Sequence, residues 1–125
     1  MQRRMTATLA GEDVTLAATF DASMEILESV HDPLSIAKEA ALEMQLAQVG
    51  QVYDGRFKWT MRNVPRVIWA GMRASGDKRD LREVQELTFK HGMIESATIA
   101  IQFVTMLVTP NSEEAQAEKG GGAGE

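Results

Sequence analysis

Cysteine is absent from this sequence of 125 residues, and its absence excludes several classes of protein. Without cysteine the chain forms no disulfide framework, no thiolate metal site and no catalytic thiol. No apolar run reaches the roughly 18 residues that a membrane-spanning helix needs. The N-terminal segment has two arginines but no long apolar stretch after them, so we expect no secretory signal. These absences favour a cytoplasmic protein without a membrane segment.

Histidine is scarce, and the sequence motifs of common enzymes are missing. The two histidines, His31 and His91, lie far apart, and neither has acidic residues near it at metal-ligand spacing. There is no P-loop, no dinucleotide fingerprint and no His-Glu-x-x-His helix. Glu25 and Glu28 are a carboxylate pair at helical spacing, which we interpret as an exposed helix face. We therefore expect no catalytic residue, no cofactor and no metal.

The overall composition of the chain is that of an ordinary folded domain. Apolar residues make up 44% of the chain and charged residues 25%. We expect residues 1–109 to form a single, mainly α domain of about five helices with a short N-terminal β-hairpin. Residues 110–125 lack an apolar anchor and are acidic and glycine-rich, which predicts a flexible tail.

The net charge of −5 is distributed unevenly along the chain. Residues 1–55 carry nine acidic and three basic side chains, and residues 83–125 carry seven acidic and two basic ones. Between them, residues 56–82 carry eight basic and only two acidic side chains. Such a basic middle either attracts an acidic partner or simply forms the solvated faces of helices and loops. The sequence leaves both interpretations open.

The stretch from Asn63 to Gly76 has the pattern of one helix with its start and end marked. Asn63 is suited to cap the helix, Pro65 fits its first turn, and Gly76 can adopt the left-handed conformation that ends it. Five residues recur at the spacing of a buried helical face: Val64, Val67, Ile68, Gly71 and Met72. Inside a helix Gly71 costs about 1 kcal/mol relative to alanine. We therefore expect another helix to cross closely there, with a bend or a partner contact as the alternative.

Two β-branched runs precede the helices. Residues 6–10 and 14–20 alternate in the manner of strands, and Gly-Glu-Asp at 11–13 predicts a short turn between them. An isolated two-stranded hairpin is only marginally stable in water. This hairpin must therefore lie on the helical body or pair with another chain.

Two helices are expected next. Asp21 or Ser23 caps the first, whose apolar side consists of Met24, Ile26, Leu27 and Val30. Asp32 as cap and Pro33 at the first position mark the start of the second, which runs toward Val49. The expected buried face of this second helix consists of Leu34, Ala37, Ala41 and Met44, widened by Leu42 and Leu46.

The C-terminal half predicts two further helices. Asp80 and Glu83 match a capping box, and Gly92 follows His91 as a stop signal. The apolar stripe of this helix consists of Leu81, Val84, Leu87 and Thr88. Residues 93–109 are rich in β-branched side chains, which favours a strand, but their length without glycine or proline favours a helix. We interpret them as a helix.

The loop at residues 54–59 places two aromatic side chains between cations, in the order Arg56, Phe57, Lys58, Trp59. Aromatics interleaved with cations can stack nucleic-acid bases or contact a protein partner. Alternatively, the aromatics fold back onto the core while the cations remain in water.

The candidate interaction surface is the central helix together with the segment that leads into it. Its six residues are Arg56, Trp59, Arg62, Arg66, Trp69 and Arg73. The last four, which we call the arginine stripe, recur every three or four residues and so share one side of a helix. The alternative is that Trp69 belongs to the core and the arginines are merely solvated.

The order of these segments resembles a known family. Leu16-Ala17-Ala18-Thr19-Phe20-Asp21 runs into an acidic helix, Val64-Pro65-Arg66-Val67-Ile68-Trp69-Ala70-Gly71-Met72 forms the central one, and His91-Gly92 ends a short helix before the last. This order is similar to the small tail assembly chaperones of long-tailed phages, in the branch found in gene transfer agents and prophages. The resemblance covers residues 9–108. The family often has Gly-Leu where this chain has Gly71-Met72.

The resemblance implies a non-catalytic role in tail morphogenesis inside the bacterial host cell. Such proteins cover the tape measure protein before tail tube subunits polymerise around it, so the implied partners are the tape measure protein, the tail tube protein or both. Self-association stays open, and some members of this branch are described as tail tube proteins. The eight methionines suit contacts with varied apolar stripes, although they also fill gaps in a core.

A small helical DNA-binding regulator is the competing hypothesis. The basic segment 56–82 and the capped helix at 80–91 can be interpreted as a helix-turn-helix pair. Glu83 and Glu86 beside Arg82 make that helix a poor reader of a DNA groove, and the net charge is unfavourable. We therefore expect a protein partner rather than nucleic acid.

Overall fold

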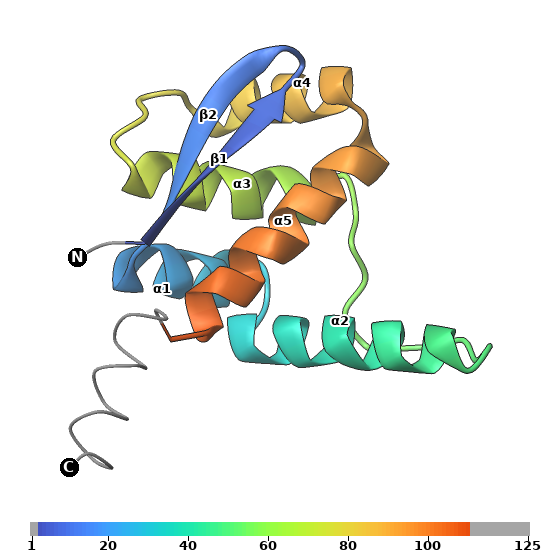
Figure 1. Ribbon diagram of the computed structural model, residues 1–125. Helices are drawn as coiled ribbons and strands as arrows, with labels where there is room; N and C mark the ends of the chain where they lie inside the picture. The colour runs from blue at the N-terminus through green and yellow to red at the C-terminus, as the bar shows by residue number, and fades with distance from the viewer. Residues whose placement is uncertain (1–2, 111–125) are drawn as a thin grey trace, which may run out of the picture.

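A two-stranded antiparallel hairpin and five helices make up residues 3–110, the part of the chain that the computed structural model describes (Figure 1). The elements are β1 (Arg3–Leu9), β2 (Glu12–Ala18), α1 (Phe20–Ser29), α2 (Pro33–Gln48), α3 (Asn63–Ala74), α4 (Leu81–His91) and α5 (Met93–Val108). The expected mainly α domain with an N-terminal hairpin is thus confirmed at this level. The tail expected beyond residue 110 lies outside the described residues.

The hairpin turns one residue earlier than its sequence suggested. Leu9 pairs with Glu12, so Ala10 and Gly11 form the two-residue turn, with φ of 51° and 85°. Positive φ at both positions matches the right-handed twist of the two strands. Glu12, expected in the turn, is instead the first residue of β2.

The inner face of the hairpin is buried on the helical body. Ala7 and Leu9 from β1, and Val14 and Leu16 from β2, are buried in the main hydrophobic cluster. Figure 1 shows the hairpin lying across α3, with α5 crossing α3 beside it. Of the two possibilities that the sequence left for the hairpin, the structure therefore shows the first, packing on the helices.

Helix α3 is the central element, since it packs against β2, α1, α4 and α5. Its start differs from the expectation that Asn63 caps it. The Thr60 hydroxyl accepts from the backbone N–H of Arg62 and of Asn63, at 3.2 and 3.0 Å, while the Asn63 side chain donates to the Lys58 carbonyl. Thr60 takes the capping role because the chain makes a turn before the helix, which sequence spacing alone did not indicate.

Helix α3 ends just before Gly76, as expected. The φ of Gly76 is 99°, and its N–H donates to the Arg73 carbonyl, while the Asp77 N–H donates to the Met72 carbonyl. These two hydrogen bonds define a Schellman motif, which satisfies the last carbonyls of the helix.

Gly71 lies where two other elements approach α3. A Cβ atom on Gly71 would come within 2.8 Å of Phe103 Cζ on α5 and 2.9 Å of Leu16 Cβ on β2. The expected close helix crossing is confirmed, and a strand approaches at the same point. Glycine is required here because the space for a side chain is already filled.

Thr19, rather than Asp21 or Ser23, caps α1. Its hydroxyl accepts from the Ala22 N–H at 3.0 Å, and the Ser23 hydroxyl donates to the Phe20 carbonyl. The helix begins at Phe20, before either expected cap, because Thr19 leaves β2 in an extended conformation that suits an N-cap.

Helix α2 starts as expected but does not bury the expected face. Asp32 caps it and Pro33 occupies its first turn. Its only buried residues are Pro33 and Ile36, whereas the expected buried face at Leu34, Ala41, Leu42 and Met44 is exposed. Figure 1 shows the C-terminal half of α2 extending away from the other helices. The expectation was wrong because apolar residues occur around the whole helix, so composition did not identify the side that packs.

The last two helices agree with the sequence. Both hydrogen bonds of the Asp80–Glu83 capping box are present, at 2.9 and 3.0 Å. Residues 93–108 form α5, which buries Phe103 and Val104 in the core, so the helical interpretation of this β-branched segment is confirmed. Within residues 3–110 no single helix has the length and apolar composition of a membrane span, and α4 and α5 reach that length only as a pair bent by 119°.

Candidate functional site

The arginine stripe lies along one side of the central helix, with Arg62 just before its first turn. Arg66, Trp69 and Arg73 follow at helical spacing on α3. Arg62 and Arg73 are exposed, whereas Arg66 and Trp69 are half-buried. The structure therefore brings together four of the six residues that the sequence indicated.

Trp69 is held in place from two sides. Its Nε1 donates to the Arg79 carbonyl over 3.1 Å, and the Arg73 guanidinium lies 5.2 Å from the centre of its ring. A cation at that distance is attracted by the negative face of an indole. Trp69 also packs against the core cluster, so it is both a packing residue and the platform that orients Arg73.

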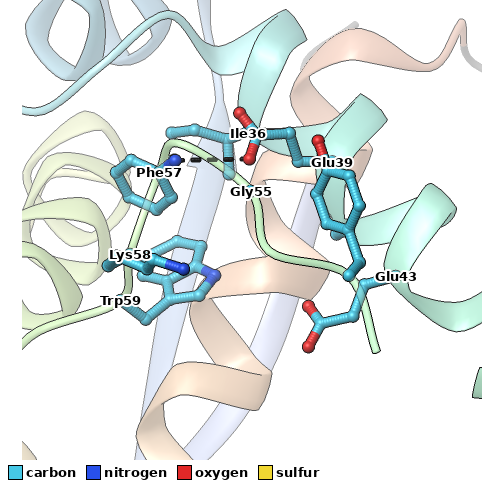
Figure 2. A pocket seen from close by; sticks show the side chains of 9 residues that line it. Ile36, Glu39, Glu43, Gly55, Phe57, Lys58 and Trp59 are labelled. Carbon is cyan, nitrogen blue, oxygen red and sulfur yellow. Dashed lines mark hydrogen bonds between the residues drawn. The ribbon is translucent and has the colours of Figure 1, made fainter. Parts of the chain in front are cut away.

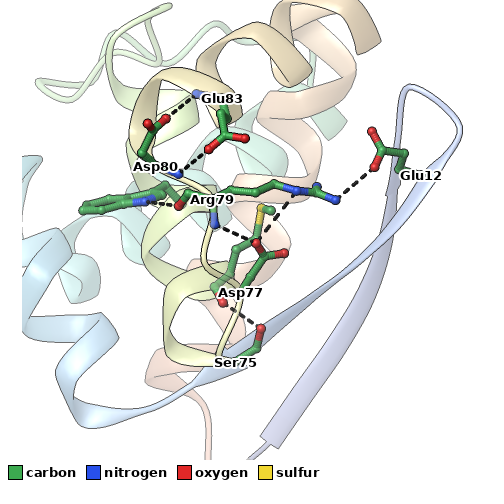
Figure 3. A network of polar contacts seen from close by, with 8 residues as sticks. Glu12, Ser75, Asp77, Arg79, Asp80 and Glu83 are labelled. Carbon is green, nitrogen blue, oxygen red and sulfur yellow. Dashed lines mark hydrogen bonds and ion pairs between the residues drawn. The ribbon is translucent and has the colours of Figure 1, made fainter.

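A polar network around Arg79 fixes the link that holds Trp69 (Figure 3). The Arg79 guanidinium pairs with Glu12 at the start of β2, at 2.9 Å, and lies 3.8 Å from Asp77. The Asp77 carboxylate also accepts from the Arg79 N–H at 3.0 Å. This network ties the hairpin tip to the α3–α4 connection, so the platform under Arg73 has little freedom to move.

The stripe does not present a uniformly basic surface. Arg73 lines an open groove between α1 and α3 together with Asp21 and Glu25, and the groove encloses about 500 Å³. An acidic partner that approached Arg73 would also meet these two carboxylates. Arg62 and Arg66 do not line that groove and are the better candidates for contact with an anionic group.

Arg56 and Trp59 lie apart from the stripe, in the loop between α2 and α3. Trp59 and Phe57 form an edge-to-face pair with ring centres 4.9 Å apart, and both pack against the core, while Arg56 and Lys58 are exposed. The structure therefore shows the second interpretation of this loop. The aromatic side chains fold back onto the core, and the cations stay in water.

The residues that sequence reasoning missed are the exposed apolar side chains on and after α2. They are Leu34, Leu42, Met44, Val49 and Val52, the last of which is 94% exposed. The sequence did contain a signal for them, because a helix that is apolar on several sides must be covered on several sides. One small domain has too few elements to cover α2 all round. We call these five residues the α2 apolar surface.

Two findings concern the ionisable side chains of residues 3–110. No three histidine or acidic side chains within residues 3–110 are grouped so that they can hold a metal ion. The side-chain hydrogen bond and the charge of Lys58 lower the pKa of the Asp54 carboxyl, and the same pair raises the pKa of Lys58. Both side chains are exposed, so this is an ordinary surface ion pair at 2.7 Å.

Comparison with protein family models, with curated proteins and with solved structures gives no match for this chain. Assignment of a function therefore depends on the surfaces described above.

Proposed function

We propose that this protein is a non-catalytic assembly chaperone that binds a long helical protein partner, of the kind that measures tail length in phage-type particles. The observation that carries the proposal is the α2 apolar surface. Helix α2 has 16 residues, yet it buries only Pro33 and Ile36 against the rest of the chain. The five exposed apolar side chains lie within α2 and the four residues after it, where they are available to a protein partner.

The chemistry of this surface suits a helical partner with apolar stripes. Leu42 and Met44 lie on different sides of α2, so the helix offers contacts over much of its circumference. Leucine and methionine side chains adapt to partners of varied shape. A long tape measure helix exposes many similar stripes before it is enclosed, and several copies of this chain can cover them. The tail tube protein is the second partner consistent with this role.

DNA binding receives less support from the surface charges. In α4, the helix that would enter a groove, Arg82 pairs with Glu86 at 3.4 Å, and Glu83 belongs to the capping box. Arg79 is engaged by Glu12 and Asp77. These contacts engage the two arginines nearest to the start of α4, so we do not propose a nucleic-acid role.

The test is co-expression with each long helical, tape-measure-like protein that the gene neighbourhood encodes, followed by size-exclusion chromatography with light scattering. We expect the partner to be soluble only in a complex that contains many copies of this chain. If this chain elutes alone while the partner still precipitates, the proposal fails, and polymerisation of this chain into tubes becomes the question to examine.

The role of the α2 apolar surface is tested with a matched pair of variants. Leu42→Gln with Met44→Gln keeps good helix formers in α2 but removes apolar contact area, and we expect the partner to precipitate. Phe89→Gln changes a comparably exposed apolar residue on α4 and should leave the complex intact. If both variants lose the complex to the same extent, the effect reflects general solubility. That result would contradict the role of α2.

A further inference from the structure

A small pocket lies between α2 and the loop that follows it, and none of its lining residues belongs to the arginine stripe (Figure 2). It encloses about 150 Å³. Its lining includes three aromatic side chains and two carboxylates: Tyr53, Phe57, Trp59, Glu39 and Glu43. Neither the overall fold nor the proposed chaperone role requires this combination of groups.

The aromatic part of the pocket is held by packing on both sides. Phe57 stacks on His31 with ring centres 5.3 Å apart, and Trp59 meets Phe57 at 90°. Phe57 and Trp59 also pack against the core cluster. The rings of Phe57 and Trp59 therefore have defined positions before any ligand arrives.

The acidic part comes from one side of α2. Glu39 and Glu43 are one helical turn apart, and Glu39 Oε1 accepts from the Phe57 N–H over 3.2 Å, which leaves its second oxygen for another donor. Lys58 also lines the pocket, but its ammonium group is paired with Asp54 at 2.7 Å. The carboxylates outnumber the cation, so the pocket has an excess of negative charge.

The shape of the pocket depends on Gly55. A Cβ atom there would lie 2.1 Å from Glu39 Oε1 and 2.4 Å from Tyr53 Cε2. Any side chain at this position would push the carboxylate and the phenol ring away from the loop. The glycine thus permits the close approach of an acidic and an aromatic group within the same pocket.

We propose that this pocket binds an organic cation, namely the guanidinium or ammonium end of a basic side chain or of a free amine. Aromatic side chains combined with carboxylates are the usual surroundings of such groups, because ring faces and carboxylates both attract positive charge. A cavity of about 150 Å³ is large enough to hold benzene, and a guanidinium group is smaller. This site goes beyond the chaperone role and does not depend on it.

Nuclear magnetic resonance titration of the full chain tests the proposal. The ligands are N-acetyl-arginine-N-methylamide, its neutral citrulline analogue, and putrescine. We expect the arginine derivative or putrescine to shift the Trp59 indole N–H and the Phe57 amide signals, and the citrulline analogue to leave them unchanged. The Trp69→Phe variant identifies which of the two indole signals belongs to Trp59. Binding of the arginine derivative assigns the cation to a protein side chain, and binding of putrescine alone assigns it to a free amine.

Variants within the pocket separate recognition from folding. Glu39→Gln with Glu43→Gln keeps an oxygen to accept from Phe57 but removes both charges, and we expect binding about tenfold weaker. Glu28→Gln makes the same chemical change on the exposed side of α1 and should have no effect. Lys58→Gln removes the competing cation and should tighten binding.

Three results would overturn the proposal. The first is a citrulline analogue that binds as well as the arginine derivative, since charge would then be irrelevant. The second is wild-type affinity in the double glutamine variant or in Gly55→Ala, which changes the shape of the pocket without changing its charge. The third is absence of binding by all cations to the wild-type chain.

Discussion

The backbone N–H of Ala10 donates to Nδ1 of His91 over 3.0 Å, which joins the hairpin turn to the last residue of α4. Ala10 has a φ of 51° and is the only non-glycine residue with positive φ among residues 3–110. The left-handed region costs alanine roughly 1 kcal/mol. The contact with His91 therefore holds a turn that is unfavourable for its own sequence.

This hydrogen bond leads to two predictions about the free energy of unfolding, which differ in sign for His91 and Ala10. His91→Ala should lower the free energy of unfolding by about 1 kcal/mol, because the Ala10 N–H loses its partner. Ala10→Gly should raise it by up to about 1 kcal/mol, because glycine adopts this conformation without strain. Urea unfolding followed by circular dichroism measures both. Destabilisation by Ala10→Gly would show that the turn is not strained.

Gly71→Ala should be strongly destabilising even though alanine is the better helix former. The new methyl group would overlap Phe103 Cζ and Leu16 Cβ. Overpacking of this kind costs about 1–3 kcal/mol, which exceeds the gain of about 1 kcal/mol in helix propensity. Thermal unfolding measures the effect.

The double variant Gly71→Ala with Phe103→Leu controls for this interpretation. Leucine lacks the ring atom nearest to the added methyl group, so the two substitutions together should cost less than the sum of their separate effects. Strict additivity would contradict direct contact as the cause.

Charge reversal tests the arginine stripe. Arg66→Glu with Arg73→Glu should leave the fold intact, since the described contacts of these side chains include no ion pair, but weaken retention of the protein partner in a pull-down. The reason is that reversing the charge at these two positions removes positive groups that would attract an acidic partner. Glu28 on α1 supplies a control, because it is exposed and its replacement by lysine alters charge on a different element. Unchanged retention with the stripe variant would remove the stripe from the interface.

The Asp54–Lys58 pair gives a prediction about pH. Lys58 lowers the pKa of Asp54 below its ordinary value. The larger cause is the hydrogen bond that Lys58 donates, and the smaller one is its positive charge. A group whose pKa is lower in the folded state stabilises the fold above its unfolded pKa and loses that contribution as the pH falls through the folded pKa. Lys58→Met should return the Asp54 pKa toward its ordinary value in a carbon-detected titration. An unchanged value would mean that the pair does not form in solution.

Several features of the fold could be predicted because their causes are local. Pro33 after Asp32, the Asp80–Glu83 capping box and the left-handed Gly76 each act within one turn of backbone, so short sequence patterns identify them. The spacing of apolar residues also identified the buried face of α3 for the same reason. The helical interpretation of residues 93–108 succeeded because length without a breaker outweighed β propensity.

The errors arose where a distant part of the chain decides the outcome. Thr60 replaces Asn63 as the cap because the α2–α3 loop, whose Phe57 is held by Glu39 of α2, leads into the helix in a turn. The exposed residues of α2 could not be assigned because its apolar residues surround the helix, and only the positions of α1 and α5 determine which side is covered.

The sequence by itself determined where α2 and α4 begin and where α3 ends, that the chain contains a hairpin, and that the central helix carries cations on one side. Hydrogen-bonding patterns within a few residues and apolar periodicity are sufficient for these features. Only the tertiary structure decided that Leu34, Leu42 and Met44 of α2 stay exposed to water. It also decided that Glu39 and Glu43 line one pocket together with Tyr53, Phe57 and Trp59. Such surfaces are made by residues from separate elements, and their contacts depend on the packing of the whole chain.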